Sequence, residues 1–476
     1  MRIRFLFCLL CFGFSIVVLA QSSTPLPSDR QLAWHELDYY LFMHFGPNTF
    51  YDQEWGHGTE DPNLFNPSQL DCRQWARIAR DAGARGIIIT AKHHDGFCLW
   101  PSQYSTHTVR ESQWQAGKGD VLRDLSAACR EYGILFGIYI SPWDRNHPLY
   151  GTPDYNSIYV KTMQEAVQRY GPICEMWWDG ANGEGPNGKK QVYDFNLFEK
   201  VIRQEAPGAV VFSDIGPDIR WVGNENGIAG ETNWNFLDTA GFQRGAGGPP
   251  QDTLNTGNIN GHHWIPAECD VSIRPGWFYH PQEDDKVKSP NELMSLYLKS
   301  VGRGANLLLN VPPDRRGLIH PHDSAALIQF RELRESFFRQ NLAYGLPVNL
   351  TLNPKRSART RLLTDGNAQT FWEGSPKQSS WTLEILLPTT QEINTLVLEE
   401  YLPRGQHIGS FSVYSSKAEA GEGEGVFQQV TQGTTIGKRR ILQFPALQSR
   451  RLRVVITSSK GAPVLRECAL YNVPVY

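Results

Sequence analysis

The feature that most constrains the fold is a repeated unit, in which a short apolar run ends in polar residues and a helical pattern follows. Residues 86–91 form an apolar run with three isoleucines, and Lys92-His93-His94-Asp95 comes directly after it. A run of this kind is typical of a strand that is buried on both faces. Apolar side chains then recur at helical spacing over residues 121–132, and Gly133 takes the C-cap position.

The same unit repeats along the first 345 residues and predicts a parallel sheet with crossover helices. Because the repetition continues over about 300 residues, we expect a closed (β/α)8-like barrel of the TIM type. An open sheet would show a glycine-rich phosphate turn after its first strand, and no GxGxxG motif occurs there. The predicted strands are 39–46, 86–91, 134–140, 173–178, 209–212 and 306–311, and the predicted helices are 70–82, 121–132, 155–170, 194–205, 293–301 and 322–341.

Two stretches depart from this pattern. Residues 216–285 are rich in Gly, Asn and Pro, which predicts long loops over the mouth of the barrel. After residue 345, short strands at 381–385, 395–398, 411–414 and 452–456 are separated by turn residues without a helical stripe. This pattern of short strands and turns predicts an antiparallel β-sandwich. We therefore expect a barrel over residues 21–345 and a sandwich over residues 346–476.

The first twenty residues have the form of a signal peptide. Arg2 and Arg4 make the start basic, residues 5–19 are apolar, and Ala20 precedes a polar stretch. We expect export with cleavage, to the periplasm or the extracellular space, and no membrane span in the mature chain, since the apolar run is short for a span. The net charge of −3 and a pI near 6.5 argue against a nucleic-acid partner.

The sequence gives no sign of a metal site or a cofactor. The cysteines beyond the signal segment contain no CxxC pair, which argues against zinc and against a dense disulfide framework. HExxH and HxxEH patterns are absent as well. On an extended strand His93 and His94 would point to opposite faces, although in a loop they could share an ion. The six cysteines, which we expect mainly as buried thiols, are Cys72, Cys98, Cys129, Cys174, Cys269 and Cys468.

Polar residues at the predicted strand ends are the candidates for chemistry, because the carboxyl ends of barrel strands carry the active site. Asp179 ends the run Ile173-Cys174-Glu175-Met176-Trp177-Trp178, and its alternative role is to cap the next helix. Tryptophans at these ends suit a sugar, whose C–H faces stack on indole. We expect Trp177 to face the ligand and Trp178 the core. The polar set is His44, His93, His94, Tyr139, Asp144, Asp179 and Asp214.

Hydrolysis of a glycosidic bond needs two carboxyl groups. Asp179 suits a nucleophile, and the proton donor has to be a second carboxyl group with an elevated pKa. Glu225, Glu231 and Glu268 are candidates, and each can also be a solvated loop residue. Trp221 and the glycines around Glu225 favour Glu225, because they could shield it from water.

Four motifs occur in order and resemble the α-L-fucosidases of glycoside hydrolase family 29 over residues 30–345. They are Phe-Met-His-Phe-Gly-Pro-Asn-Thr-Phe at 42–50, Thr-Ala-Lys-His-His-Asp-Gly-Phe at 90–97, Gly-Ile-Tyr-Ile-Ser-Pro-Trp-Asp at 137–144 and Met-Trp-Trp-Asp-Gly at 176–180. Residues 346–476 are similar to a galactose-binding-like sandwich, mainly around residues 364–367 and 371–372.

The resemblance implies a retaining mechanism with Asp179 as nucleophile and a fucosylated oligosaccharide or glycoconjugate as substrate. The stretch Arg220-Trp221-x-Gly223-Asn224-Glu225-x-Gly227 resembles the branch that cleaves α-1,3/4-linked fucose, which implies Glu225 as acid/base. Trp264 and Trp277 would wall the pocket for the C6 methyl group. The implied fucose contacts are His44, Glu54, Trp55, His93, His94, Tyr139 and Trp177.

Two alternatives stand beside this hypothesis. The chain could be a fucose-binding, lectin-like protein whose barrel has lost its activity, or a retaining glycosidase for another sugar such as galactose. The sandwich could brace the barrel or bind carbohydrate itself.

Overall fold

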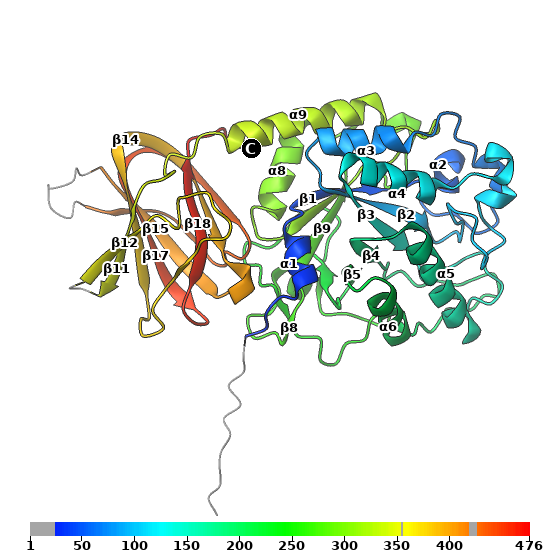
Figure 1. Cartoon of the computed structure of the whole chain (residues 1–476), viewed down its shortest axis with the longest axis horizontal. Helices are drawn as coiled ribbons and strands as arrows, with labels where there is room; N and C mark the ends of the chain where they lie inside the picture. The colour runs from blue at the N-terminus through cyan, green and yellow to red at the C-terminus, as the bar shows by residue number, and fades with distance from the viewer. Residues whose placement is uncertain (1–23, 354–355, 418–425) are drawn as a thin grey trace, which may run out of the picture.

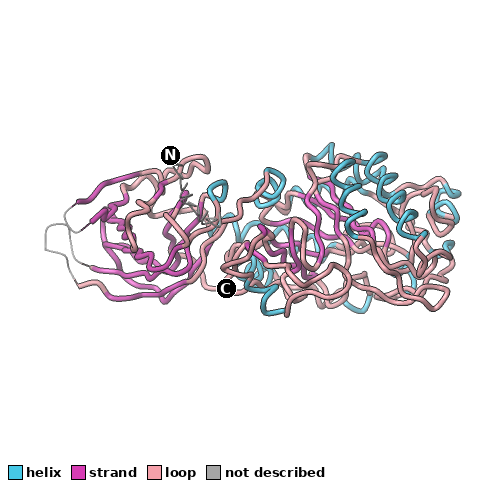
Figure 2. The backbone as a smooth tube through the Cα atoms, turned by 90° about the horizontal axis from the view of Figure 1, so that it is seen from below, coloured by secondary structure: helices cyan, strands magenta, loops and turns pink. Residues whose placement is uncertain are grey.

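The computed structural model describes residues 24–353, 356–417 and 426–476; the predicted signal peptide at 1–20 lies outside them. The chain forms a barrel and a β-sandwich that lie side by side along the long axis of the molecule (Figure 1). Seen from below, helices gather around the barrel, whereas the sandwich consists mainly of strands and loops (Figure 2). The predicted fold class, a (β/α)8-like barrel followed by an antiparallel β-sandwich, is confirmed.

The barrel closes through eight parallel strands in the order β1-β10-β9-β6-β5-β4-β3-β2. Its strands are β1 (Tyr39–Met43), β2 (Gly86–Lys92), β3 (Leu135–Ile140), β4 (Glu175–Trp177), β5 (Val210–Ser213), β6 (Ile219–Trp221), β9 (Ala267–Ser272) and β10 (Asn306–Asn310). The helices are α1 (Asp29–His35), α2 (Pro47–Tyr51), α3 (Cys72–Asp81), α4 (Val121–Tyr132), α5 (Asp154–Tyr170), α6 (Phe195–Glu205), α7 (Gln251–Thr256), α8 (Pro290–Ser300) and α9 (Pro321–Phe337).

The region 216–285 is not only loops, contrary to our prediction, because it contains the barrel strands β6 and β9. Both strands carry polar residues at buried positions, so they lack the apolar run that marks the other strands. In β9, Glu268 and Asp270 alternate with Cys269 and Val271, and the latter two belong to apolar clusters. Between the two strands lies a small hairpin of β7 (Phe236–Leu237) and β8 (His263–Trp264).

Alternation along the strands divides the side chains between the inside of the barrel and the layer below the helices. Trp177 packs with Tyr40, Phe42 and Phe212 in one apolar cluster inside the barrel. Trp178 is fully buried in the main core and packs against the aromatic rings of α6. Neighbouring residues on a strand point to opposite faces, so the predicted division between Trp177 and Trp178 is confirmed.

The sandwich is one antiparallel set of strands around a second apolar core. The predicted strands at 381–385 and 395–398 are two halves of one long strand, β14, which shifts register against β17 between Leu386 and Gln391. The first half pairs with β11 and the second with β18. The strands are β11 (Val348–Asn353), β12 (Arg356–Thr360), β13 (Trp372–Glu373), β14 (Trp381–Glu400), β15 (Ile408–Ser416), β16 (Gln428–Gly433), β17 (Arg440–Ser459) and β18 (Val464–Tyr471).

Charged side chains that are partly or fully buried join the barrel to the sandwich. Asp38, just before β1, pairs with Lys438 and accepts from Arg439 Nη1 at 3.0 Å, while Arg439 Nε donates to Glu399 at 2.6 Å. Burial opposes ionisation, but Arg439 and Lys438 hold the pKa of Asp38 well below its usual range. None of the helices in the described part of the chain has the length and apolar character that a bilayer crossing requires.

Candidate active site

The candidate active site is a cavity of about 190 Å³ at the carboxyl ends of the barrel strands. Side chains from the ends of β1, β2, β3 and β4 meet there with side chains from the loops after β6 and β9. Of the residues that the family resemblance assigned to the site, the structure places all except Trp264 in its lining, whereas Asp144 and Asp214 of the polar set do not line this cavity. The lining consists of Phe42, His44, Glu54, Trp55, His93, His94, Tyr139, Trp177, Asp179, Ala181, Glu225, Asp270 and Trp277.

Asp179 lies two residues beyond β4, and both of its carboxylate oxygens are held. The Tyr139 hydroxyl donates to Oδ2 at 3.0 Å, and the Ala181 N–H donates to Oδ1 at 2.8 Å. His94 Nε2 lies 3.7 Å from Oδ2. Gly180 has no Cβ, and a Cβ there would collide with the Asp214 carboxyl group. The arrangement fixes the carboxylate toward the cavity while one quarter of its side chain is still exposed.

Three histidines line the cavity as neutral imidazoles. Burial lowers the pKa of His44 to about 4 and also lowers the pKa values of His93 and His94. His44 Nδ1 lies 2.9 Å from Asn310 Oδ1, and His94 Nδ1 lies 2.8 Å from Ser141 Oγ. A neutral imidazole offers one donor and one acceptor, which suits the hydroxyl groups of a sugar.

Glu54 fixes one wall of the cavity. Its carboxylate accepts from the backbone N–H groups of Trp277 at 2.8 Å and Phe278 at 3.1 Å, and it lies 2.6 Å from His280 Nε2. These contacts hold the Trp277 ring 5.2 Å from the His44 ring. Trp55, 54% exposed, stands edge-on to His94 at the rim.

Glu225 stands in the loop after β6 and reaches the same cavity. Trp277 Nε1 donates to Glu225 Oε2 at 3.3 Å. Gly223 and Gly227 bracket the loop with positive φ values, a conformation that side chains with a Cβ rarely adopt. The desolvated surroundings that we expected for Glu225 are not present, because its side chain is exposed.

The other two acid candidates lie elsewhere. Glu231 is on the surface, with 76% of its side chain exposed, and its backbone oxygen accepts from Thr434 and Arg440 of the sandwich. Glu268 is fully buried inside the barrel, where it accepts from Trp177 Nε1 at 2.9 Å and from the Tyr40 hydroxyl. Neither carboxyl group lines the cavity, so the geometry favours Glu225 among the three.

The prediction that Trp264 walls the pocket is wrong. Trp264 lies in β8 and packs in a separate apolar cluster with Trp234, Phe236 and Leu402. Its indole N–H contacts His35 Nε2 at 3.3 Å. The small hairpin that turns Trp264 away from the cavity carries no clear strand pattern in the sequence, and the apolar wall is supplied by Phe42 and Trp277 instead.

Two further carboxyl groups lie near the site. Asp270 was not among the expected site residues, and Asp214 was expected at a strand end without a specific role. Asp270, in β9, is 4% exposed, lines the cavity and has one buried oxygen, Oδ1, without a hydrogen-bond partner among the described residues. Burial raises the pKa of Asp270 well above its usual range, and Glu268 and Glu225 add to the rise. Burial, and then the nearby Asp179, raises the pKa of Asp214 to about 6.

An adjoining cavity of about 310 Å³ continues from the first. Asp179, Glu225, Asp270 and Trp177 line both cavities. The second is also lined by Phe212, Asp214, Trp221, Pro249, Gln251 and Leu254. Among the described residues, no group of three or more His, Cys, Asp and Glu side chains is placed to hold a metal ion. The paired cavities, with fixed carboxylate, neutral imidazoles and indole rings, suit a sugar with a substituent.

Comparison with known proteins agrees with this geometry. A family model described as "Alpha-L-fucosidase" matches residues 27–332. The chain belongs to the α-L-fucosidase family. Alpha-L-fucosidase 1 of Arabidopsis thaliana is 41% identical over 479 residues, which cover 97% of this chain and 92% of that protein.

Solved structures of this family share the whole architecture. The crystal structure of SpGH29 superposes with a TM-score of 0.87 at 38% identity, covering 95% of this chain and 99% of that one. A Ruminococcus gnavus glycoside hydrolase 29 fucosidase in complex with fucose gives a TM-score of 0.83 at 28% identity, covering 94% and 95%. The predicted family and the predicted class of enzyme, an α-L-fucosidase of glycoside hydrolase family 29, are confirmed.

Proposed function

We propose that this α-L-fucosidase works by a retaining mechanism, with Asp179 as nucleophile and Glu225 as acid/base. The observation that carries the proposal is that both carboxyl groups face the same pair of cavities from different elements. Tyr139 and Ala181 orient Asp179, and Trp277 contacts Glu225. Retaining glycosidases use two carboxyl groups in this way.

In the first step an Asp179 oxygen attacks the anomeric carbon of fucose while the bond to the leaving-group oxygen breaks. Glu225 donates its proton to that oxygen, and a fucosyl ester of Asp179 forms. In the second step Glu225 takes a proton from water, whose oxygen displaces Asp179 from the anomeric carbon. Two inversions give fucose with its original anomeric configuration.

The lining of the cavity supports a preference for L-fucose over L-galactose. Fucose carries a methyl group where galactose carries a hydroxymethyl group, and Phe42 and Trp277 offer apolar surface for it. A galactose 6-hydroxyl against that wall would lose its hydrogen bonds to water, which costs about 1–3 kcal/mol. The neutral His44 and His93 are partners for the remaining hydroxyl groups.

The preferred linkage belongs to the same proposal. The loop that carries Glu225, with Trp221 at its base, supports α-1,3/4-linked fucose on branched glycans. The test compares Lewis-type α-1,3/4-linked oligosaccharides with α-1,2-linked ones, and proton NMR follows the first anomer released. We expect α-fucose first and faster release from the α-1,3/4 linkage. Release of β-fucose first would refute retention, and equal rates would remove the linkage proposal.

We also propose that the enzyme is exported, as its basic and apolar start suggests, and that the sandwich braces the barrel. Contacts between the loop after β6 and the sandwich support the second point. Asn235 N donates to Gln406 at 2.7 Å, and Asn233 N donates to Thr435 at 2.8 Å. The same loop carries Glu225, so the sandwich would hold the acid/base loop in place.

A further inference from the structure

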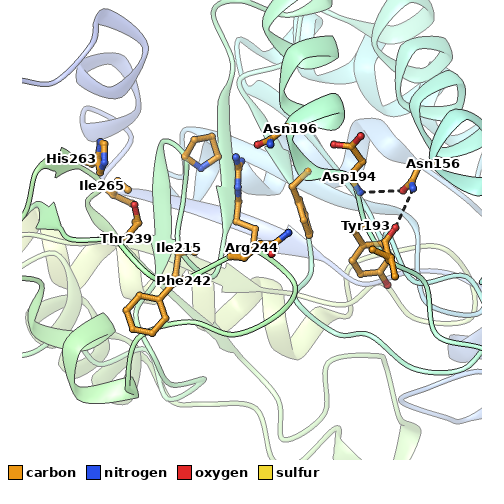
Figure 3. A pocket seen from close by; sticks show the side chains of 14 residues that line it. Asn156, Tyr193, Asp194, Asn196, Ile215, Thr239, Phe242, Arg244, His263 and Ile265 are labelled. Atoms are coloured by element: carbon orange, nitrogen blue, oxygen red, sulfur yellow. Dashed lines mark hydrogen bonds between the residues drawn. The ribbon is translucent and has the colours of Figure 1, made fainter. Parts of the chain in front are cut away.

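A third cavity, of about 680 Å³, lies outside the two catalytic cavities, and Figure 3 shows its lining. Its walls come from the start of α6, from the residues after β5, from the loop 239–244 and from β8. Ile215 belongs to its lining, and a Cβ on Gly248 of the neighbouring catalytic cavity would lie 3.2 Å from Ile215. Ile215 and Ile265 of this cavity and Leu254 of the neighbouring one belong to one apolar cluster, together with Leu237. The volume is within the range of small-molecule sites, about 300–1,000 Å³.

Arg244 lies between the two sides of this cavity, with His263 and Ile265 on one side and Asp194 on the other (Figure 3). Its Nη2 donates to Glu199 at 2.8 Å, whereas its Nη1 is buried and has no acceptor among the described residues. A buried donor without an acceptor is energetically unfavourable. The Arg244 side chain is 15% exposed, so little of its guanidinium reaches water. Arg244 lines the cavity, so a ligand there can contact the exposed part of its side chain.

The charges around the cavity favour a neutral ligand. Glu199 pairs with Arg244 at 2.8 Å and with Arg203 at 3.5 Å, and Arg203 also pairs with Asp218 at 2.6 Å. Asp194 adds a further negative charge and caps α6. Because each cation already has a carboxylate partner, the cavity holds no excess of positive charge for a phosphate or a sulfate.

The remaining lining has the chemistry of a carbohydrate site. Phe242 is 41% exposed and presents a ring on which the C–H face of a sugar can stack. Asn196 and Gln243 carry both donors and acceptors, and Thr239 adds a hydroxyl group. Amide and hydroxyl groups in the same lining as an aromatic ring suit the hydroxyl and N-acetyl groups of a hexose.

We infer that this cavity is an accessory site that binds a neutral sugar unit of the glycan, other than the fucose that is released. The inference adds a binding site to the family's activity and does not depend on the roles proposed for Asp179 and Glu225. A small aryl α-L-fucoside has no such sugar unit and would leave the site empty. The site therefore acts on oligosaccharide substrates alone.

The test uses Phe242→Ala in the whole enzyme, with Tyr344→Ala as matched control, because Tyr344 is 67% exposed and lies outside all three cavities. We expect Phe242→Ala to raise KM for a cleaved fucosyl oligosaccharide about tenfold, with kcat and the kinetics of the aryl fucoside unchanged. Tyr344→Ala should change neither substrate. Unchanged KM for the oligosaccharide, or an equal rise for both substrates, would overturn the inference.

A direct binding measurement covers the case of a folding defect. N-acetyllactosamine, which contains no fucose, should bind the wild-type enzyme in isothermal titration and should bind Arg244→Met and Phe242→Ala at least fivefold more weakly. Wild-type affinity in both variants would show that the sugar binds elsewhere, and absence of binding to the wild-type enzyme would also refute the site.

Discussion

The Tyr139 hydroxyl donates to Asp179 Oδ2 at 3.0 Å and thereby ties the end of β3 to the end of β4. Burial, and then the Asp179 carboxylate, raises the pKa of Tyr139 well above its usual range, so the phenol keeps its proton. With Ala181 N–H on the other oxygen, Asp179 is oriented before the substrate enters. Such preorganisation costs no rearrangement during the reaction.

Tyr139→Phe should lower kcat/KM about tenfold or more, because a hydrogen bond to a charged group contributes roughly 1.5–3 kcal/mol. The ring stays, so the melting temperature should change little. Steady-state kinetics with an aryl α-L-fucoside measure the effect. Wild-type kcat/KM in Tyr139→Phe would contradict an orienting role for the hydroxyl.

Glu225→Ala should separate substrates by their leaving groups. We expect a fall of about 10²–10⁴-fold for an oligosaccharide, whose leaving oxygen needs a proton, and a far smaller fall for an activated aryl fucoside in the first step. Glu231→Ala is the control, since Glu231 lies on the surface. If Glu231→Ala shows the leaving-group dependence and Glu225→Ala does not, the assignment of Glu225 is wrong.

The two tryptophans that we predicted as a pair should respond differently. Trp277→Ala removes a wall of the cavity and the contact to Glu225, so KM should rise several-fold with a small loss of stability. Trp264→Ala opens a hole in a packed cluster and should destabilise the fold by about 3–5 kcal/mol. The milder Trp264→Phe should lower the melting temperature and leave KM unchanged; a raised KM would place Trp264 back in the site.

Asp214→Asn tests the electrostatics beside Asp179. Burial raises the folded-state pKa of Asp214 to about 6, above that of an exposed Asp. Between about pH 4 and 6 the unfolded chain releases this proton more readily than the folded protein does. The free energy of unfolding therefore falls by roughly 1–3 kcal/mol as the pH rises through this range. Asp214→Asn carries no titratable group at this position and avoids the loss of stability. Its melting temperature should therefore be higher than that of the wild-type enzyme at pH 7, but not at pH 4. An equal change in melting temperature at both pH values would contradict the raised pKa of Asp214.

Most of the barrel could be predicted because its strands are apolar and its helices are amphipathic. Residues 86–91 become β2 and residues 121–132 become α4, with Gly133 at φ 69° as predicted. Strands β6 and β9 could not be predicted in this way, because Arg220, Glu268 and Asp270 occupy buried positions in them. The folded chain supplies partners for two of these residues, Tyr40 and Trp177 for Glu268 and backbone carbonyl groups for Arg220, and a linear pattern does not show them.

The site residues could likewise be predicted where they end a clearly apolar strand, and not elsewhere. Residues that end clear strands, such as His44, His93 and Asp179, could be placed at one mouth from the pattern alone. Asp270 was missed because its strand was missed, although the alternation of Glu268 and Asp270 with Cys269 and Val271 is a signal for a half-polar strand. Trp264 was misplaced because a two-residue strand, β8, turns it toward a different cluster.

During turnover, fucose should become covalently attached to Asp179. A 2-deoxy-2-fluoro-fucosyl fluoride slows the second step, so incubation followed by proteolysis and mass spectrometry can locate the trapped ester. We expect the mass of one fluorofucosyl group on the peptide that contains Asp179, and no such adduct in Asp179→Ala. An adduct on a peptide without Asp179, or none at all while the enzyme still turns over natural substrate, would contradict the account.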